Sequence, residues 1–174
     1  MTTQETDDPT AGLRIRQAVR GVIVTPDRSI LLCRFEFPSG TTWALPGGGL
    51  ESGETHRQAL DRELEEEIGL APGDVDIGPL IWKRLHIVPF VNGDWDGQAD
   101  QYHLVEVPDR FEPTPAIGWE QLRAERLHEL RWWSLDEAAE ATAGGTRFAP
   151  GRLAELLVDL RDQGPPTSII DTGV

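Results

Sequence analysis

The first part of the chain alternates short apolar runs with turn signals. Strand-prone residues fill 18–24, Pro26-Asp27-Arg28 interrupts them, and residues 29–37 are again mostly apolar. Runs of this length around a proline-containing turn are typical of two strands joined as a hairpin. We therefore predict a β-hairpin at the start of the folded region.

The next segment turns from a short strand into the clearest helix of the chain. Residues 41–45 should be extended, and Pro46 followed by three glycines predicts a sharply bent loop. Leu60, Leu64 and Ile68 then recur every four residues and form an apolar stripe on one side of a helix.

The ends of this helix also have sequence signals. Thr55 and Gln58 have the spacing of a capping box, and Gly69 is a suitable C-terminal stop. Further along, residues 108–128 give no clear pattern. The remaining predicted elements are strands over 79–90, 101–107 and 130–134, a polar loop over 92–100, a short helix over 135–141, and a last helix with Pro150 near its first turn that ends at Gly164.

Strands and helices mix, and hairpins occur beside longer connections. This order favours an α/β fold with a central mixed β-sheet rather than a purely parallel one. We predict one folded domain over residues 13–163, a flexible tail over 1–12 and a loose tail over 164–174.

Composition and charge exclude several classes of function. The 174 residues include 39% hydrophobic and 26% charged positions, which suit a single packed domain. The formal net charge of −14 argues against binding polymeric nucleic acid, which needs basic surfaces. We expect no membrane span and no secretory signal, and the lone Cys33, expected to be a buried apolar residue, is compatible with a cytoplasmic protein.

Three glutamates are expected on one face of the predicted helix. On a wheel of about 100° per residue with Leu60 at zero, Glu63, Glu66 and Glu67 fall between about 240° and 340°. Glu65 falls on another side, at about 140°. The three carboxylates would border the apolar stripe.

Such a row of like charges has two readings. It destabilises a helix by roughly 0.2–0.5 kcal/mol per pair unless the carboxylates take up protons or share a cation. Oxygen ligands with no nearby lysine suit Mg²⁺. The alternative is a solvated acidic face, which charge spacing alone favours.

The surrounding residues change this balance. The segment from Gly48 to Leu70 resembles the signature of the Nudix hydrolases in both residue types and spacing. The flanking segments 43–46 and 131–137 are also similar to Nudix segments, so the resemblance covers roughly 13–163. The matching signature positions are Gly48, Glu54, Arg62, Glu63, Leu64, Glu66, Glu67, Gly69 and Leu70.

The resemblance implies a Nudix-like α/β/α sandwich and hydrolysis of a phosphoanhydride in a nucleoside diphosphate linked to another group. It implies Mg²⁺, or sometimes Mn²⁺, as cofactor. Glu63, Glu66 and Glu67 would be metal ligands with the carbonyl of Gly48, and Glu66 or Glu67 would bridge metals or activate water. Arg62, grouped with these catalytic residues, and Glu54 would steady the site by ion pairing.

Residues outside the signature are weaker candidates. Glu120 and Glu125 precede the 131–137 segment and are candidates for a further catalytic carboxylate, or are solvated surface residues. Several side chains could contact substrate: Arg34 and Arg84 through its phosphates, Trp95 by stacking on a base, and Arg14, Arg16 and Arg20, which share one face of a strand that begins early.

Two other functions remain open at this stage. One is a nucleotide sensor that uses the fold without catalysis. The other is isopentenyl diphosphate isomerisation, whose enzymes have a similar fold and need a reactive cysteine with an acidic partner. For a hydrolase, the small-molecule substrate could be a nucleoside triphosphate, ADP-ribose or another nucleotide sugar, or a dinucleoside polyphosphate. A homodimer is a further expectation from the resemblance.

Overall fold

The computed structural model describes residues 10–90 and 92–173, so the predicted tail over 1–12 lies almost entirely outside the described residues. The elements in chain order are β1 (Ile15–Val24), β2 (Ile30–Phe37), β3 (Gly40–Ala44), β4 (Gly47–Gly49), α1 (His56–Ile68), β5 (Leu80–His86), β6 (Gly97–Glu106), α2 (Gly118–Ala124), β7 (Leu127–Trp133), α3 (Leu135–Ala143), β8 (Phe148–Ala149), α4 (Leu153–Gln163) and β9 (Ile170–Asp171).

The strands form one curled mixed sheet in the order β8-β3-β2-β1-β6-β5-β9. The predicted hairpin is present, but β1 and β2 pair only beside the turn, at Val24 and Ile30. Beyond that point β1 pairs with β4, and β2 pairs with β7 and β3. Because β1 and β6 are parallel while β5 and β6 are antiparallel, the predicted mixed sheet is confirmed.

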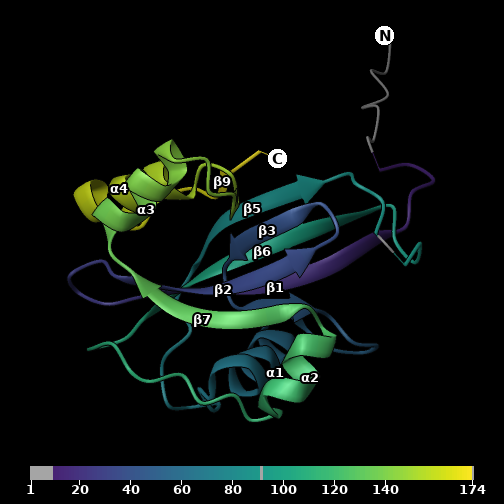
Figure 1. Ribbon diagram of the computed structural model, residues 1–174, viewed down its shortest axis with the longest axis horizontal. Helices are drawn as coiled ribbons and strands as arrows, with labels where there is room; N and C mark the ends of the chain where they lie inside the picture. Colours follow the sequence, from purple (N-terminus) through teal and green to yellow (C-terminus); the bar gives the residue numbers. More distant parts are fainter. Residues whose placement is uncertain (1–9, 91, 174) are drawn as a thin grey trace, which may run out of the picture.

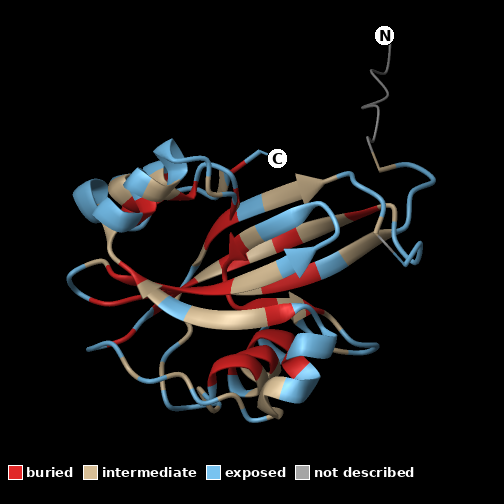
Figure 2. Ribbon diagram, viewed as in Figure 1, coloured by how far each residue is buried: buried red, intermediate tan, exposed pale blue. Residues whose placement is uncertain are grey.

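Helices cover both faces of this sheet. Figure 1 shows α1 and α2 together on one side and α3 and α4 on the other. Apolar side chains of α1 pack on Val19, Ile23 and Leu31, while those of α4 pack on the opposite face, which includes Val22 and Val24. Figure 2 shows the buried residues gathered along the sheet and the inner sides of the helices. The predicted α/β/α sandwich is therefore the observed architecture.

The caps of α1 follow the sequence signals. The Thr55 hydroxyl accepts a hydrogen bond from the Gln58 backbone, and the Gln58 side chain bonds back to the Thr55 backbone. Gly69 ends the helix in the left-handed conformation with φ of 74°. Because a Cβ there would also meet the Thr114 carbonyl at 2.2 Å, glycine is required on two grounds. These caps set where the glutamates of α1 lie.

Two predicted loops turn out to contain strands. Residues 47–49, expected as a bent loop, form β4 because their backbone pairs with residues 18–20 of β1. β6 begins at Gly97, inside the predicted polar loop over 92–100, because its parallel pairing with β1 starts at Ile15. Long-range backbone pairing decides both cases, and local polarity does not reveal it.

The C-terminal part also differs from expectation. The segment predicted as a loose tail forms β9 beside β5, and the Thr172 backbone N–H donates to the Lys83 carbonyl over 2.9 Å. The last helix starts at Leu153, so Pro150 lies just before its first turn, as expected. The unassigned stretch 108–128 contains α2. In the described part of the chain, no helix has the length and apolarity needed to cross a membrane.

Candidate functional site

The glutamate row of α1 lies against the glycine strand β4. Glu63 and Glu67 are buried and Glu66 is half-buried, whereas Glu65 is exposed. The predicted division of these glutamates between two sides of the helix is therefore confirmed. A Cβ on Gly48 would lie 2.4 Å from Glu63 Oε1, so the absence of a side chain makes room for that carboxylate.

Arg62 connects the site. Its Nε donates to Glu54 Oε1 over 2.8 Å and its Nη2 to Glu54 Oε2 over 2.9 Å. Its Nη1 donates to Glu63 Oε1 over 2.8 Å and to Glu66 Oε2 over 3.3 Å. Nη2 also donates to the Gly49 carbonyl over 3.1 Å. The ion pairs expected of Arg62 are thus present, and they tie the helix to β4.

Glu67 is held from another side. The Gly47 backbone N–H donates to Glu67 Oε2 over 2.8 Å. Burial, followed by the nearby charge of Glu63, raises the pKa of Glu67 to about 8. Glu63 and Glu67 are both buried, and neighbouring buried carboxylates are stable only if one takes up a proton or a cation binds to both.

Cys33 lies beside the same carboxylate. Its Sγ is 3.9 Å from Glu67 Oε2, and the residue is fully buried, as predicted. Burial and the charge of Glu67 raise the pKa of the Cys33 thiol well above its ordinary value. A cysteine with an acidic partner is therefore present, but its surroundings favour the thiol over the nucleophilic thiolate that an isomerase needs.

The donor atoms can be compared with what a divalent metal requires. Within residues 10–90 and 92–173, no group of three His, Cys, Asp or Glu side chains is arranged to hold a metal ion. Arg62 accounts for this, because its Nη1 occupies both Glu63 and Glu66 while Glu67 turns toward Gly47. The donors nevertheless fit Mg²⁺ in chemistry, since they are three carboxylates on one side of a helix and carboxylate oxygens are ligands that Mg²⁺ prefers.

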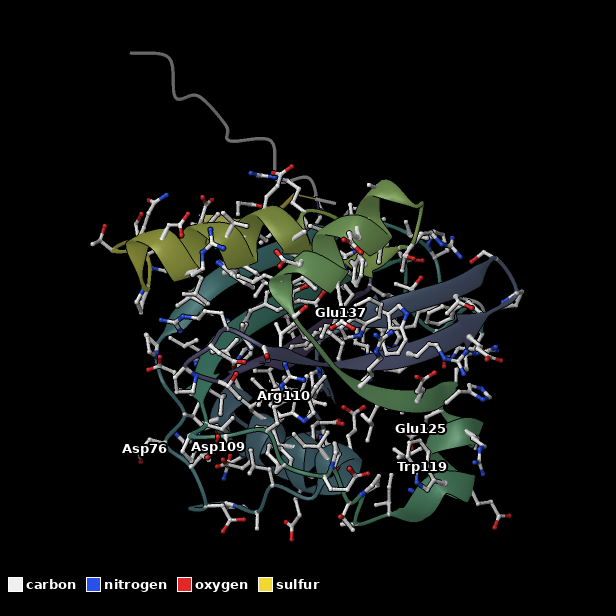
Figure 3. The ribbon with its side chains drawn as sticks, turned by 60° about the vertical axis from the view of Figure 1, so that its left-hand side comes forward. Asp76, Asp109, Arg110, Trp119, Glu125 and Glu137 are labelled. Atoms are coloured by element: carbon white, nitrogen blue, oxygen red, sulfur yellow. The ribbon has the colours of Figure 1, made fainter. Side chains whose placement is uncertain are left out.

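The two candidate loop carboxylates differ in position. Leu122 and Leu127, on either side of Glu125 in the chain, pack with Cys33, whose Sγ lies 3.9 Å from Glu67 Oε2. Figure 3 shows Glu125 near the junction of α2 and β7. Glu120 lies exposed in the first turn of α2 and makes no ion pair with any described residue. The geometry therefore favours Glu125 over Glu120.

The candidate substrate-binding residues do not form one group. Arg34 lies on β2, where its guanidinium is occupied by Glu36 and by Glu129, the latter at 2.8 Å. Arg84 lies on β5, and β1 and β6 separate β5 from β2. Trp95 is 37% exposed in the connection between β5 and β6. Arg84 belongs to a polar cluster around Asp100.

That cluster centres on an ion pair that sequence reasoning missed. Arg20 Nε donates to Asp100 Oδ1 over 3.0 Å, and Gln98 Nε2 donates to the same oxygen over 2.7 Å. Arg84 Nη1 lies 4.0 Å from Asp100 Oδ2. The available signal was the alternation of Gln98, Asp100 and Tyr102, which is typical of a strand. It was hidden because this stretch resembles the end of a polar loop.

Comparison with curated proteins finds relatives that are named as hydrolases of phosphorylated nucleotides. The chain is 35% identical over 94 residues to the putative 8-oxo-dGTP diphosphatase 2 of Mycobacterium tuberculosis, covering 54% of this chain and 62% of that protein. The chain thus aligns with less than two thirds of that relative's length.

Solved structures agree on the fold. The MutT NUDIX hydrolase from Burkholderia pseudomallei is 25% identical with a TM-score of 0.56, covering 83% of this chain and 98% of that one. The dihydroneopterin triphosphate pyrophosphohydrolase of E. coli is 15% identical with a TM-score of 0.60, covering 84% and 98%. The latter likeness bears on the fold alone.

The family itself is settled by a match over most of the chain. The model of the NUDIX domain matches residues 14–151, which include the glutamate row, β4 and Arg62. The expected resemblance is thereby confirmed, and this chain belongs to the NUDIX domain family.

Proposed function

We propose that this chain hydrolyses a phosphoanhydride bond in a nucleoside diphosphate linked to another group. The observation that carries the proposal is the gathering of Glu63, Glu66 and Glu67 on one side of α1 against β4, where Arg62 pairs with the first two and the Gly47 N–H bonds the third. Three carboxylates beside a glycine strand are costly for stability alone. They are useful where a cation and phosphate groups must be brought together.

Each residue of the site has a part in this proposal. Glu63, Glu66 and Glu67, with the carbonyl of Gly48, would hold Mg²⁺ or Mn²⁺, which when bound supplies charge neutralisation for the phosphates and an activated water. Arg62 pairs bidentately with Glu54, and its hydrogen bond to the Gly49 carbonyl positions the helix against β4. No serine, cysteine or histidine nucleophile is required.

A further carboxylate would orient or deprotonate the attacking water. We assign this to Glu125 rather than Glu120, because Glu125 lies between Leu122 and Leu127, which pack with Cys33 beside Glu67. An exposed carboxylate at the edge of the row can reach water and substrate without opening the core.

Among the substrate classes, a nucleoside triphosphate is favoured. The support is the 35% identity with a protein named for 8-oxo-dGTP. ADP-ribose or another nucleotide sugar and dinucleoside polyphosphates are the competing classes. The alternative function is a nucleotide sensor on the same fold, which would bind nucleotide with metal and release no product.

A substrate panel tests the proposal. The full chain is assayed for phosphate or pyrophosphate release from members of the three classes, in Mg²⁺ and in EDTA, beside Glu66→Gln. We expect turnover of one class that needs Mg²⁺ and is lost in the variant. Nucleotide binding without any product across the panel would replace the hydrolase with the sensor.

A further inference from the structure

The sheet face that packs on α4 changes from apolar to polar beyond the helix. Here the register of β1, β6 and β5 brings nine side chains into three rows. The rows are Arg16 with Gln98 and His86, Ala18 with Asp100 and Arg84, and Arg20 with Tyr102 and Trp82. We call Arg16, Arg20 and Arg84, with Asp100 among them, the arginine face.

Charge on the arginine face is not balanced. Three guanidiniums share this face with the single carboxylate of Asp100, while the charges of Glu63 and Glu67, outside this face, also act on Arg16 and Arg20. The side chains of Arg20, Arg84 and Asp100 are 14%, 11% and 1% exposed. Arg84 Nε and Asp100 Oδ2 are buried without any hydrogen-bond partner. Buried donors usually have partners, so Arg84 Nε, which has none among the described residues, is a group that an anion would satisfy, whereas Asp100 Oδ2 is an acceptor and would not be satisfied in this way.

Arg16 has free donors on this face. Its Nη1 donates to Gln98 Oε1 over 3.1 Å, and its other nitrogens have no hydrogen-bond partner among the described residues. Burial, and then repulsion by Arg20, lower the pKa of Arg16. An anion beside Arg16 would relieve both effects.

The arginine face and the glutamate row lie on opposite sides of β4. A Cβ on Gly49 would meet Arg16 Nε at 2.3 Å, just as one on Gly48 would meet Glu63 Oε1 at 2.4 Å. Successive residues of a strand face opposite sides, so β4 has a carboxylate on one side and a guanidinium on the other. In the described structure β4 pairs with β1, and its adjacent residues Gly48 and Gly49 lie against Glu63 and Arg16, respectively.

We propose that the arginine face binds a phosphate beyond the two joined by the scissile bond. Guanidinium groups suit this role because they bind phosphate oxygens in pairs. The substrate would then be a nucleoside triphosphate or dinucleoside polyphosphate rather than ADP-ribose. ADP-ribose has only two phosphates, and the scissile bond joins them, so none is left for the arginine face. This inference rests on the proposed function for the position of that bond.

Binding of inorganic tripolyphosphate tests the site without catalysis. Calorimetric titration of the full chain in EDTA compares wild type with Arg16→Gln and with Arg161→Gln. The control removes the same charge from an exposed arginine of α4. We expect about tenfold weaker binding in Arg16→Gln, the order of one charge-assisted hydrogen bond, and no change in the control. Absent binding to the wild type, or equal affinities in all three, would overturn the proposal.

Two further comparisons keep the result clear. If Arg16→Gln does not fold by circular dichroism, Arg84→Lys takes its place with the same expected weakening, because it keeps the charge and removes the planar fork. In turnover, Arg16→Gln should raise KM for a nucleoside triphosphate and leave KM for ADP-ribose unchanged, whereas equal changes would overturn the substrate assignment. If no substrate is hydrolysed, the proposed function fails while the titration still decides the site.

Discussion

Alanine at position 48 is a direct probe of how β4 and Glu63 fit together. The added Cβ would lie 2.4 Å from Glu63 Oε1 and 2.6 Å from its Cδ, whereas ordinary contacts begin at 3.4 Å. The carboxylate must therefore move by about 1 Å, and a displacement of that size costs on the order of 10²-fold in rate when it misplaces a catalytic group. Because Glu63 is flexible at its end, the free energy of unfolding should fall by only about 1 kcal/mol.

The assay measures kcat on the best substrate in Mg²⁺, with urea unfolding of the same samples. Gly144→Ala is the matched control, because its Cβ would meet its nearest atoms, the Glu140 and Ala141 carbonyls, at 3.4 and 3.5 Å and its φ is −78°. We expect about a 100-fold loss of kcat in Gly48→Ala and none in the control. A Gly48→Ala enzyme with wild-type kcat would refute the reasoning, because Glu63 would then tolerate displacement.

Three further predictions concern the rest of the chain. Hydrogen bonds from Arg14 hold the pKa of Asp96 at about 2, so this pair stabilises the fold above pH 3.8 and loses its effect as pH falls through 2. Arg14→Gln should raise the Asp96 midpoint in a ¹³C NMR titration toward 3.8, although the backbone N–H of residue 14 still bonds Asp96, and an unmoved midpoint would show that the Arg14 side chain is not a cause. Cys33 should react with a thiol reagent only after unfolding, and rapid labelling of the native protein would contradict its burial. Ile170→Ala should lower the free energy of unfolding by about 1 kcal/mol because β9 packs on the core, while Ile169→Ala, at a 48% exposed position, should not; equal effects would argue against docking of β9.

The helix at the site could be predicted almost completely from sequence. Its caps at Thr55 and Gly69, its apolar stripe and the separate direction of Glu65 depend on residues within a few turns of one another. Local physical chemistry decides such features, so a single sequence is enough to derive them.

The parts that were missed depend on distant pairing. Gly47–Gly49 and Gly97–Asp100 look like loops, and they become strands because β1 supplies backbone partners for both. The register of β1 with β6 also places Asp100 beside Arg20, which no local pattern reveals. The same limit applies to Arg34, whose two acidic neighbours include Glu129 from β7.

The glutamate row is the centre of the account, and a matched set of variants tests it most directly. The rate of phosphate or pyrophosphate release in Mg²⁺ is measured for Glu63→Gln, Glu66→Gln and Glu67→Gln beside Glu65→Gln, which makes the same change at an exposed position of the same helix. The account predicts a loss of at least about 100-fold in each of the first three and a near wild-type rate in the fourth. Wild-type rates in all four variants, or an equal loss in Glu65→Gln, would contradict it.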